Sequence, residues 1–377
     1  MPAPMPKPGS RGFALAASLF ALVLMAALIA GVFFAARQEM RLGENVQSAE
    51  RAFDAAEAGL HSALARWDPG AYDGLPAGGS AGFSGALPLG TGSFSGSVLR
   101  LNRRLFLVQS TGQDPGGVSR RTLAGLVRLV PAPLAFGAAI SVTGQVEANG
   151  GILVLGEDRP PPGRDCPSAG AAVAGVAIRY ATGLILHGCA DSSCIRGDPP
   201  VRLVPTLGDS ASHPADGLAW TGLTAMATKV YDAEGVPTTN PSPAGTATTC
   251  DTSARDNWGE TAVPPAVAGC AHYYPIIYAR GDLRITGGSG QGILLVGGDL
   301  EVEGGFAFYG PVMVRGKLTV QGAGGRFAGA VEAASASLLP GGAGTVQLAF
   351  SRCAVDNALL SAAPASRLAE RSWAELF

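Results

Sequence analysis

An uncharged, mostly apolar run from Phe13 to Ala36 constrains this chain more than any other feature of its sequence. An α-helix rises about 1.5 Å per residue, so a helix over this run crosses a bilayer core of about 30 Å. A helix that is apolar on every side needs lipid or other helices around it. The run therefore predicts a helix that spans a membrane or packs in a helical bundle.

The helix is expected to continue beyond the apolar run. Over residues 46–64, apolar side chains recur at steps of three and four, which places them on one stripe of a helix. They are Val46, Ala49, Phe53, Ala56, Leu60 and Ala63 or Leu64. No proline interrupts residues 13–67, and Asp68-Pro69-Gly70 is a strong terminator. The sequence therefore predicts one helix over residues 13–67, about 80 Å long.

Three features lie close together near the N-terminus. A short basic leader ends in Arg11-Gly12, the apolar run starts at Phe13, and the segment AFDAAEAGL follows over Ala52–Leu60. Residues 8–67 thereby resemble the N-terminal segment of type IV pilins, most closely PilX-type minor pilins and K-type minor pseudopilins. The resemblance implies that a prepilin peptidase removes residues 1–12 by cleavage after Gly12, and that Phe13 is then methylated.

The resemblance also implies that the helix packs into a filament core. The side chains expected to pack it are Phe13, Leu15, Ala17, Leu19, Phe20, Leu22, Leu24, Phe53 and Leu60. One of these positions departs from the family pattern, because most members carry a glutamate where this chain has Ala17. PilX-like and K-type subunits also lack that glutamate, so the resemblance implies a tip or initiating subunit.

The implied partners are other pilin or pseudopilin subunits and the inner-membrane assembly machinery. The implied location is the inner membrane, crossed once, with the body in the periplasm or on a cell-surface pilus. Two simpler interpretations of the apolar run compete with this one. It could be a plain single-pass anchor, or a cleaved secretory signal, although signal sequences have apolar regions of only about 7–15 residues.

Composition narrows the function and fold of the remaining chain. A net charge of −2 gives no support for a nucleic-acid partner. With 54 glycines, 15% charged residues and 47% hydrophobic residues, the chain favours turn-rich β-structure around a packed core. A membrane-targeted N-terminus would place the six cysteines in a compartment where disulfides persist.

A β-meander is expected directly after the helix, within residues 68–132. Residues 70–95 are rich in Gly, Ser, Ala and Pro and are predicted to form a loop. Alternating segments at 98–101, 105–110 and 121–130 then predict antiparallel strands. Such a meander has one apolar face, and the stripe on the preceding helix would cover it. Helix followed by meander is also what the pilin resemblance implies.

An internal repeat of glycine, alternating polar and apolar residues, and glycine predicts a β-solenoid over residues 133–350. Its four copies are residues 144–150, 281–287, 298–304 and 316–322. The cysteine-containing segment 157–274 separates the first copy from the second and is predicted to be a loop-rich insertion with one short helix over 218–231. Residues 351–377 are predicted to form a helical cap, with Trp373 packed on the end of the solenoid.

The cysteines offer disulfides or a metal site. Cys250 and Cys270 are the favoured pair, because they would close a loop around Asp256-Asn257-Trp258-Gly259. Cys166 with Cys189 or Cys194 is the next candidate pair. The alternative is zinc bound by His187, Cys189 and Cys194, but the second ligand pair usual in zinc sites is missing.

Signs of other chemistry are weak. Asp282 and Asp299 occupy matching repeat positions, but the period and glycine order differ from those of calcium-binding β-rolls, so turn aspartates are the simpler interpretation. Gly78–Gly82 matches a serine nucleophile elbow without the strand and helix that the elbow needs. The remaining candidates are dispersed charges and two isolated histidines, namely Arg284, Glu301, Glu303, Lys317, His213 and His272.

The sequence thus predicts an α+β, mainly β protein with a long N-terminal helix, an antiparallel pilin-like meander and an interrupted β-solenoid. The expected function is that of a minor pilin or pseudopilin-like structural subunit of a type IV pilus or a type II secretion-like filament. No enzyme activity, cofactor or metal is expected, and any adhesion target of the solenoid stays open. The alternatives are a permanently anchored, self-associating envelope solenoid and, third, a polysaccharide-active solenoid enzyme.

Overall fold

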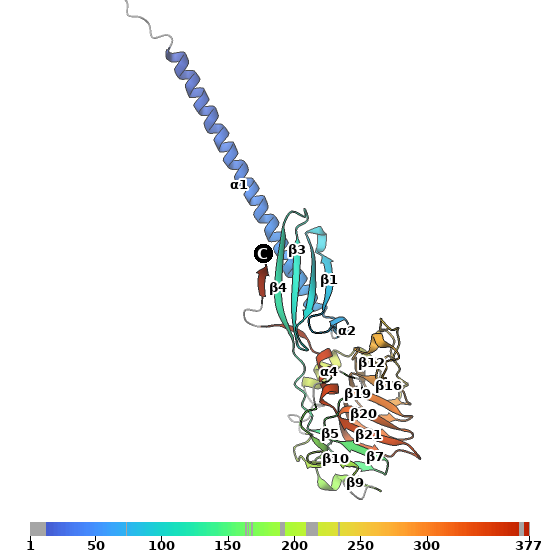
Figure 1. The fold of residues 1–377 in the computed structure, drawn as a ribbon. Coiled ribbons are helices and arrows are strands. Elements are labelled where there is room, and N and C mark those ends of the chain that lie inside the picture. The colour runs from blue at the N-terminus through green and yellow to red at the C-terminus, as the bar shows by residue number, and fades with distance from the viewer. Residues whose placement is uncertain are drawn as a thin grey trace, which may run out of the picture.

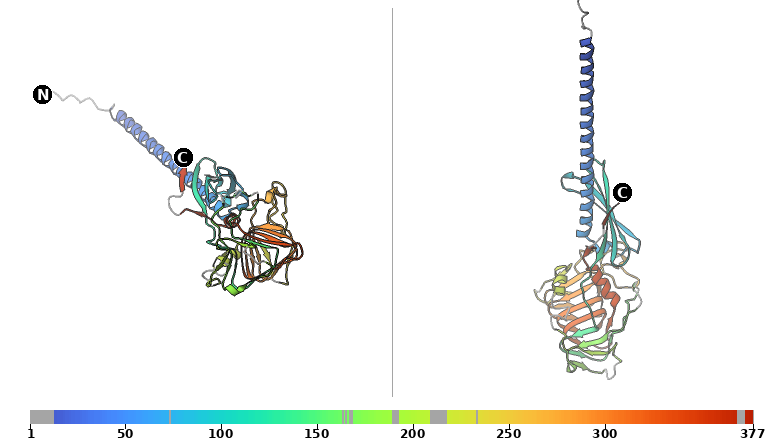
Figure 2. Two further views of the ribbon diagram at one scale, coloured as in Figure 1. Left: turned by 60° about the horizontal axis from the view of Figure 1, so that its bottom comes forward. Right: turned by 90° about the vertical axis from the view of Figure 1, so that its left-hand side faces the viewer.

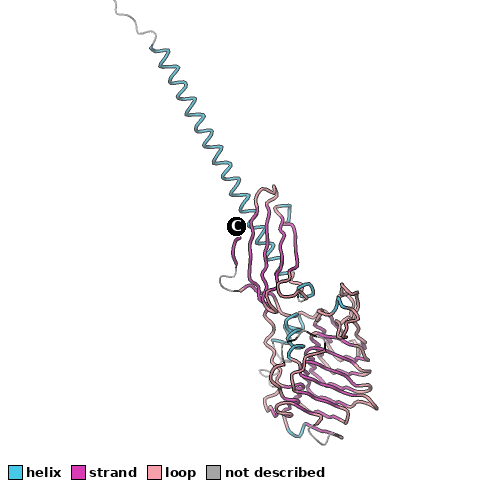
Figure 3. Tube along the Cα trace, in the orientation of Figure 1, coloured by secondary structure: helices cyan, strands magenta, loops and turns pink. Residues whose placement is uncertain are grey.

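Three parts follow one another in space: a long helix, an antiparallel sheet and a parallel stack of strands (Figures 1 and 3). The computed structural model describes residues 13–72, 74–162, 164, 166, 169–188, 193–208, 218–232, 234–368 and 373–376. This arrangement confirms the predicted α+β, mainly β fold.

The N-terminal helix α1 (Phe13–Ala65) is continuous across the apolar run and the polar segment after it. It ends two residues before the predicted boundary. A short helix, α2 (Pro69–Tyr72), follows, and its first turn is capped by Asp68, whose Oδ1 accepts a hydrogen bond from the amide of Ala71 at 3.3 Å. The predicted terminator Asp68-Pro69-Gly70 therefore follows the end of α1 and also begins the short helix α2.

The antiparallel sheet, called the head sheet below, packs on the C-terminal third of α1. Its strands are β1 (Ser80–Ala86), β2 (Ser93–Arg100), β3 (Leu105–Gln113), β4 (Arg120–Leu129), β22 (Ala365–Arg367) and β23 (Trp373–Leu376). Consecutive strands from β1 to β4 pair in order, and β22 and β23 both pair with β4. The meander is thus present, with an additional strand before it and two more from the far end of the chain.

The prediction of a loop over residues 70–95 was wrong for residues 80–86, which form β1, and for residues 93–95, which begin β2. Each aromatic ring of the β1–β2 pair lies over a glycine of the opposite strand: Phe83 over Gly96, and Phe94 over Gly85. Glycines covered by two aromatic rings thus take the place of the apolar residues from which a strand is usually predicted. A short 3-10 turn, η1 (Pro88–Gly90), connects the two strands.

Helix α1 approaches the head sheet unusually closely through small residues. Ala52, Ala55 and Ala56 are fully buried against the sheet. On β3, Gly112 faces them, and a side-chain carbon built there would collide with the helix backbone at Ala52 and Ala56. The alanine-rich segment noted in the sequence is therefore the surface on which the helix meets the sheet.

The parallel stack consists of three columns of strands, all paired in parallel. The right-hand view of Figure 2 shows one face of this stack. One column holds β12 (Lys229–Tyr231), β14 (Ile276–Ala279), β17 (Ile293–Val296), β5 (Ala138–Val142), β8 (Ala174–Ile178) and β11 (Val201–Leu203). A second holds β13 (Thr238–Thr239), β15 (Leu283–Ile285), β18 (Leu300–Val302), β6 (Val146–Ala148) and β9 (Leu184–Leu186). The third holds β16 (Ser289–Gln291), β21 (Thr345–Phe350), β7 (Ile152–Leu155) and β10 (Ile195–Arg196).

Two long strands, β19 (Phe306–Val320) and β20 (Gly324–Leu338), bend through all three columns. The repeat found in the sequence coincides with the second column. Leu283 pairs with Leu300, and Leu300 with Leu318, at equivalent repeat positions. The central apolar residues of the repeats point into one continuous core, which is why they recur at this spacing.

The segment 157–274 is rich in loops, as predicted, but the prediction that it is an insertion outside the stack was wrong, because its short strands β8 to β13 belong to the parallel stack. The chain enters the stack in its middle at β5 and builds outward to β11. It then crosses to the opposite end through helix α3 (Leu218–Ala225) and returns from β12 to β20, which pairs with β5. Strands such as β8, buried at every position, carry no alternating pattern that would reveal them.

The predicted helical cap over residues 351–377 is only partly correct. Helix α4 (Arg352–Ser361) forms, with Ser351 as its N-cap, and it packs on β19 and β20. The tail after α4 forms β22 and β23 instead of a helix, and Trp373 is 58% exposed on the head sheet. The parallel stack is therefore inserted between β4 and β22 of the head sheet.

Trp258 closes the end of the stack near the head. Its ring is fully buried and meets Phe306 and Phe308 edge-on, with centroid distances of 6.1 and 6.4 Å. It lies on the loop that the Cys250–Cys270 disulfide closes, with the two Cα atoms 4.7 Å apart. A capping tryptophan thus exists, but it comes from this loop and not from the C-terminus.

The second disulfide differs from the candidates. Cys166 pairs with Cys353 of α4 and not with Cys189 or Cys194; its two Cα atoms lie 5.7 Å apart across 187 residues of sequence. Spacing along the chain could not reveal this pair, because its two cysteines are 187 residues apart and are brought together by the tertiary structure. Cys194 is also disulfide-bonded, and Cys189 lies outside the described residues.

Replacing Gly112 with alanine is expected to destabilise the contact between α1 and the head sheet by about 1–3 kcal/mol, because the added carbon must displace helix backbone. The measurement is hydrogen–deuterium exchange of the detergent-solubilised full chain, which should speed up at β3 and at residues 50–60. Gly82→Ala is the matched control, since its added carbon meets only a carbonyl oxygen at 3.8 Å. Equal exchange in both variants would contradict the close-contact model.

Removing the Cys250–Cys270 disulfide by a double alanine substitution is expected to lower the free energy of unfolding by about 3 kcal/mol, as a loop of this length predicts. The loosened loop should expose Trp258, which shifts its fluorescence to longer wavelength. A Trp258→Phe variant identifies the signal among the four tryptophans. An unchanged emission spectrum in the double variant would argue against the disulfide as the support of this cap.

Candidate functional site

The N-terminal part of α1 exposes a large apolar surface. Leu15, Leu19 and Phe20 are 68%, 56% and 66% exposed, and Leu22 and Leu24 are exposed as well. This part of the helix projects away from the body in both views of Figure 2. Over residues 15–65 the helix is long and apolar enough to cross a membrane, judged by length and composition. Each large apolar side chain gains about 1.5–3 kcal/mol on burial, so this surface calls for lipid or other helices.

The predicted packing residues divide into two groups. Leu15, Ala17, Leu19 and Phe20 lie on the exposed part of the helix. Phe53 and Leu60, in contrast, pack inside the molecule on the core between α1 and the head sheet.

The predicted processing site lies at the edge of the structure. Arg11 and Gly12 lie outside the described residues. Phe13 begins α1, and its side chain is not described.

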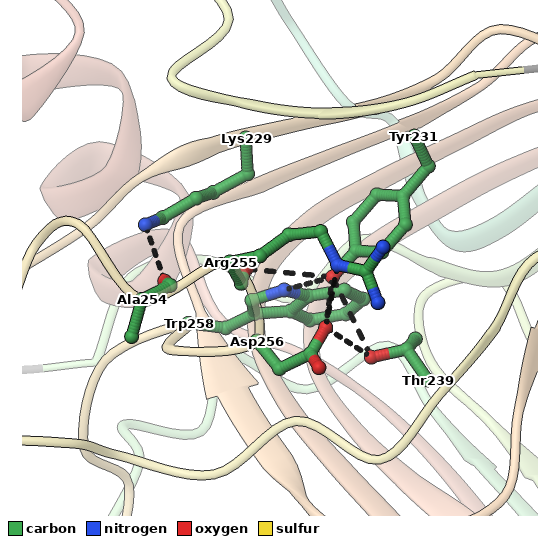
Figure 4. Close-up of polar contacts among 7 residues, drawn as sticks. All are labelled: Lys229, Tyr231, Thr239, Ala254, Arg255, Asp256 and Trp258. Atoms are coloured by element: carbon green, nitrogen blue, oxygen red, sulfur yellow. Dashed lines mark hydrogen bonds and ion pairs between the residues drawn. The ribbon is translucent and has the colours of Figure 1, made fainter.

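A polar network connects the Cys250–Cys270 loop to β12 and β13 (Figure 4), and its side chains are buried except for the partly exposed Asp256 and the exposed Arg255. The Tyr231 hydroxyl donates to Asp256 Oδ1 at 2.7 Å, and the Thr239 hydroxyl donates to the same oxygen at 2.9 Å. Trp258 Nε1 donates to the Tyr231 hydroxyl at 3.1 Å. Desolvation by burial is the main reason that the pKa of Tyr231 rises to about 12. Although desolvation opposes it, these hydrogen bonds lower the pKa of Asp256.

Lys229 anchors the same loop from β12. Only 4% of its surface is exposed, and its Nζ donates to the carbonyls of Thr252 and Ala254 at 2.7 and 2.5 Å. Desolvation lowers the pKa of Lys229, while the charges of Asp251 and Asp256 oppose that change. The ammonium group is thus used to hold backbone carbonyls.

The network supports the cap at the end of the stack. Its polar groups are hydrogen-bonded to one another, which is typical of a structural network and not of a reactive centre. Sequence reasoning missed it, although the Asp256-Asn257-Trp258-Gly259 segment between two cysteines was the available signal. The strand that carries Lys229 and Tyr231 was predicted as the end of a helix, which hid their relation to the loop.

The two repeat aspartates form a ladder along one corner of the stack. Asp282 Oδ1 accepts a hydrogen bond from the amide of Asp299 at 2.8 Å, and Asp299 Oδ1 accepts one from the amide of Lys317 at 2.7 Å. The glycines before these amides, Gly298 and Gly316, leave the space that each carboxylate occupies. This geometry is that of turn aspartates, as the sequence favoured over calcium.

Three of the other candidate charges, Arg284, Glu301 and Glu303, also have partners. Among the described residues no group of three or more His, Cys, Asp and Glu side chains could hold a metal ion. Arg284 pairs with Glu301 at 2.8 Å, and Gln321 donates to both Glu301 and Glu303. These side chains therefore form a polar ladder on the outer face of the second column.

The remaining candidates lie in separate places. Ser80, the serine of the elbow-like segment, opens strand β1 after a turn, so the required strand and helix do not flank it. His272 lies at the junction between the head sheet and the parallel stack, where it lines two cavities. His213 lies outside the described residues.

An Asp299→Ala variant is expected to lose about 0.5–1.5 kcal/mol of stability, because one amide of the next coil loses its acceptor. Asp299→Asn retains an oxygen in the same position and should recover most of that loss. Thermal unfolding of the full chain measures both variants, with Asp232→Ala as an exposed-aspartate control. If a calcium chelator lowered the stability of the unmodified protein, the turn-aspartate interpretation would be wrong.

Comparisons with known proteins leave the family open. No protein-family model matches the chain, and no curated protein matches it. Among solved structures, it is similar to the competence-associated pilin ComZ from Thermus thermophilus at 12% identity and a TM-score of 0.24. That match covers 87% of this chain and 97% of the other. A TM-score this low does not establish a shared fold or function.

Proposed function

We propose that this chain is a minor pilin-like subunit of a type IV pilus or of a related secretion filament. In this proposal α1 first anchors the precursor in the inner membrane, with the body in the periplasm. The same helix then packs among the apolar helices of other subunits. The assembly machinery of the inner membrane is the expected partner at the transfer between these two states.

One observation carries the proposal: a single continuous helix is apolar and exposed at its N-terminal end, and its C-terminal end packs closely on an antiparallel sheet. A simple anchor needs only the apolar end. The alanine-rich segment over Ala52–Leu60 gives the helix a rigid connection to the head sheet, so a force on the helix reaches the folded body. Rigid transmission is what extraction from a membrane into a filament requires.

The parallel stack serves in this proposal as a β-solenoid display module. It lies at the opposite end of the molecule from the exposed helix (Figure 1). A stack of this kind would project from a filament whose core contains α1. The absence of a glutamate at Ala17 supports a tip or initiating position, as in PilX-type and K-type subunits, because such a subunit needs no contact from that residue to the preceding subunit.

The N-terminal residue of the mature protein tests the proposal. Mass spectrometry of membrane and sheared-surface fractions should find chains that begin at N-methylated Phe13. A Gly12→Val variant should accumulate as the uncleaved precursor in the membrane and vanish from the sheared fraction. Gly9→Val is the matched control within the same leader and should be processed normally.

Two outcomes would contradict the proposal. An intact N-terminus in every fraction, with the protein confined to membranes, would favour a permanently anchored envelope protein. A chain shortened to a position beyond the apolar run would favour a cleaved secretory signal and a soluble body.

A further inference from the structure

A cavity of about 390 Å³ lies where the head sheet meets the parallel stack. Four cationic or titratable side chains from three separate segments line it. Arg100 and Arg103 come from the end of β2 and the turn after it, Arg164 from the segment after β7, and His272 from the segment before β14. No aspartate or glutamate is among the described residues that line this cavity.

Neutral groups hold the guanidinium of Arg164 in place. Its Nη1 donates to the carbonyl of Ala271 at 2.7 Å, and its Nη2 donates to Gln291 Oε1 at 2.6 Å and to the carbonyl of Glu260. The side-chain carboxylate of Glu260 is used elsewhere, because it accepts from the amides of Ala262 and Val267. The positive charge of Arg164 is thus positioned without being neutralised by Glu260.

Arg103 is placed in the same way. Its Nη2 donates to the side-chain oxygen of Asn357 on α4. Asn102 orders the turn that carries it, since its side chain accepts from the amides of Arg104 and Leu105. Two guanidinium groups therefore converge on one cavity with neutral partners, and guanidinium groups bind carboxylate, sulfate and phosphate oxygens well.

His272 reports on the charge of the cavity. Desolvation, followed by the positive charges of Arg164 and Arg100, lowers the pKa of His272. Asp68 and this histidine both line the adjoining cavity. An anion bound in the cavity would reverse the effect of the arginines and raise the pKa of His272, so binding would strengthen as the pH falls through that pKa.

The remaining walls are apolar or aromatic. Val263, Pro265, Tyr274 and Leu360 line the cavity beside the cationic groups. A volume of this order accommodates a small molecule, and apolar walls with a few charged groups are typical of ligand sites. The composition fits a compact ligand body that carries one oxyanion group.

We infer that this cavity binds a small molecule through a carboxylate, sulfate or phosphate group held between Arg103 and Arg164. The site joins the head sheet, the segment after β7 and α4, so a bound anion links the two halves of the body. It is independent of the role of α1 and of any filament. The oxyanion of the ligand supplies the negative charge that the neutral partners of the two guanidinium groups lack.

The test uses the detergent-solubilised full chain with carbon-13-labelled histidine. The protein has four histidines, and a His272→Gln variant assigns the signal. Titrations in sodium sulfate, sodium phosphate and sodium glucuronate, each matched in ionic strength to sodium chloride, measure the pKa of His272. We expect at least one oxyanion to raise that pKa relative to chloride, and the comparison identifies which group the site prefers.

Arg103→Gln should weaken binding of that anion about tenfold, the effect of losing one charge-assisted hydrogen bond. Arg326→Gln, an exposed arginine on β20, is the matched control and should leave the affinity unchanged. Hydrogen–deuterium exchange at β3 and α4 verifies that the Arg103→Gln variant is folded.

Two results would overturn the inference. One is an identical His272 pKa in chloride and in all three oxyanions, which shows that the arginines only hold the junction together. The other is an oxyanion effect that persists unchanged in a folded Arg103→Gln protein, which places the binding elsewhere.

Discussion

The close contact between α1 and strand β3 is the constraint on which the rest of this molecule depends. Three buried alanines on the helix and Gly112 on the strand bring two backbones together with almost no side chain between them. A contact of this kind tolerates little change in volume, because the interior has no flexible atoms to move. It makes the apolar end of the helix a rigid extension of the folded body.

The parallel stack depends on the same sheet in a less direct way. Its chain leaves the head sheet after β4 and returns to it at β22, so both chain termini of the stack are connected to one sheet. A stack of parallel coils has an open end wherever its last coil stops, and unpaired strands there invite aggregation. Trp258 and the polar network around Tyr231 and Asp256 close the end nearest the head, while the Cys166–Cys353 disulfide ties the segment between β7 and β8 to α4.

Patterns that are local in the sequence were predicted well. The helix over residues 13–65, the three central strands of the head sheet and the repeats of the second column all follow from periodicity within a few residues. The elements that were not predicted share one cause: they are determined by contacts between segments that are distant in the sequence. Strand β1 uses glycines beneath aromatic rings of its neighbour, β8 is buried on both sides, and the C-terminal strands form because β4 offers a free edge.

The sequence by itself determined that one end of this chain needs an apolar environment, because a helix over residues 13–36 is uncharged and mostly apolar on every side. It also determined that a repeated strand would stack on itself, since each copy carries one apolar side. Only the tertiary structure decided the order of the coils, the pairing of Cys166 with Cys353 and the gathering of Arg103, Arg164 and His272 at one junction. These outcomes depend on where the chain passes from one end of the stack to the other. That path is stabilised by packing between residues far apart in the sequence, which no short stretch of sequence encodes.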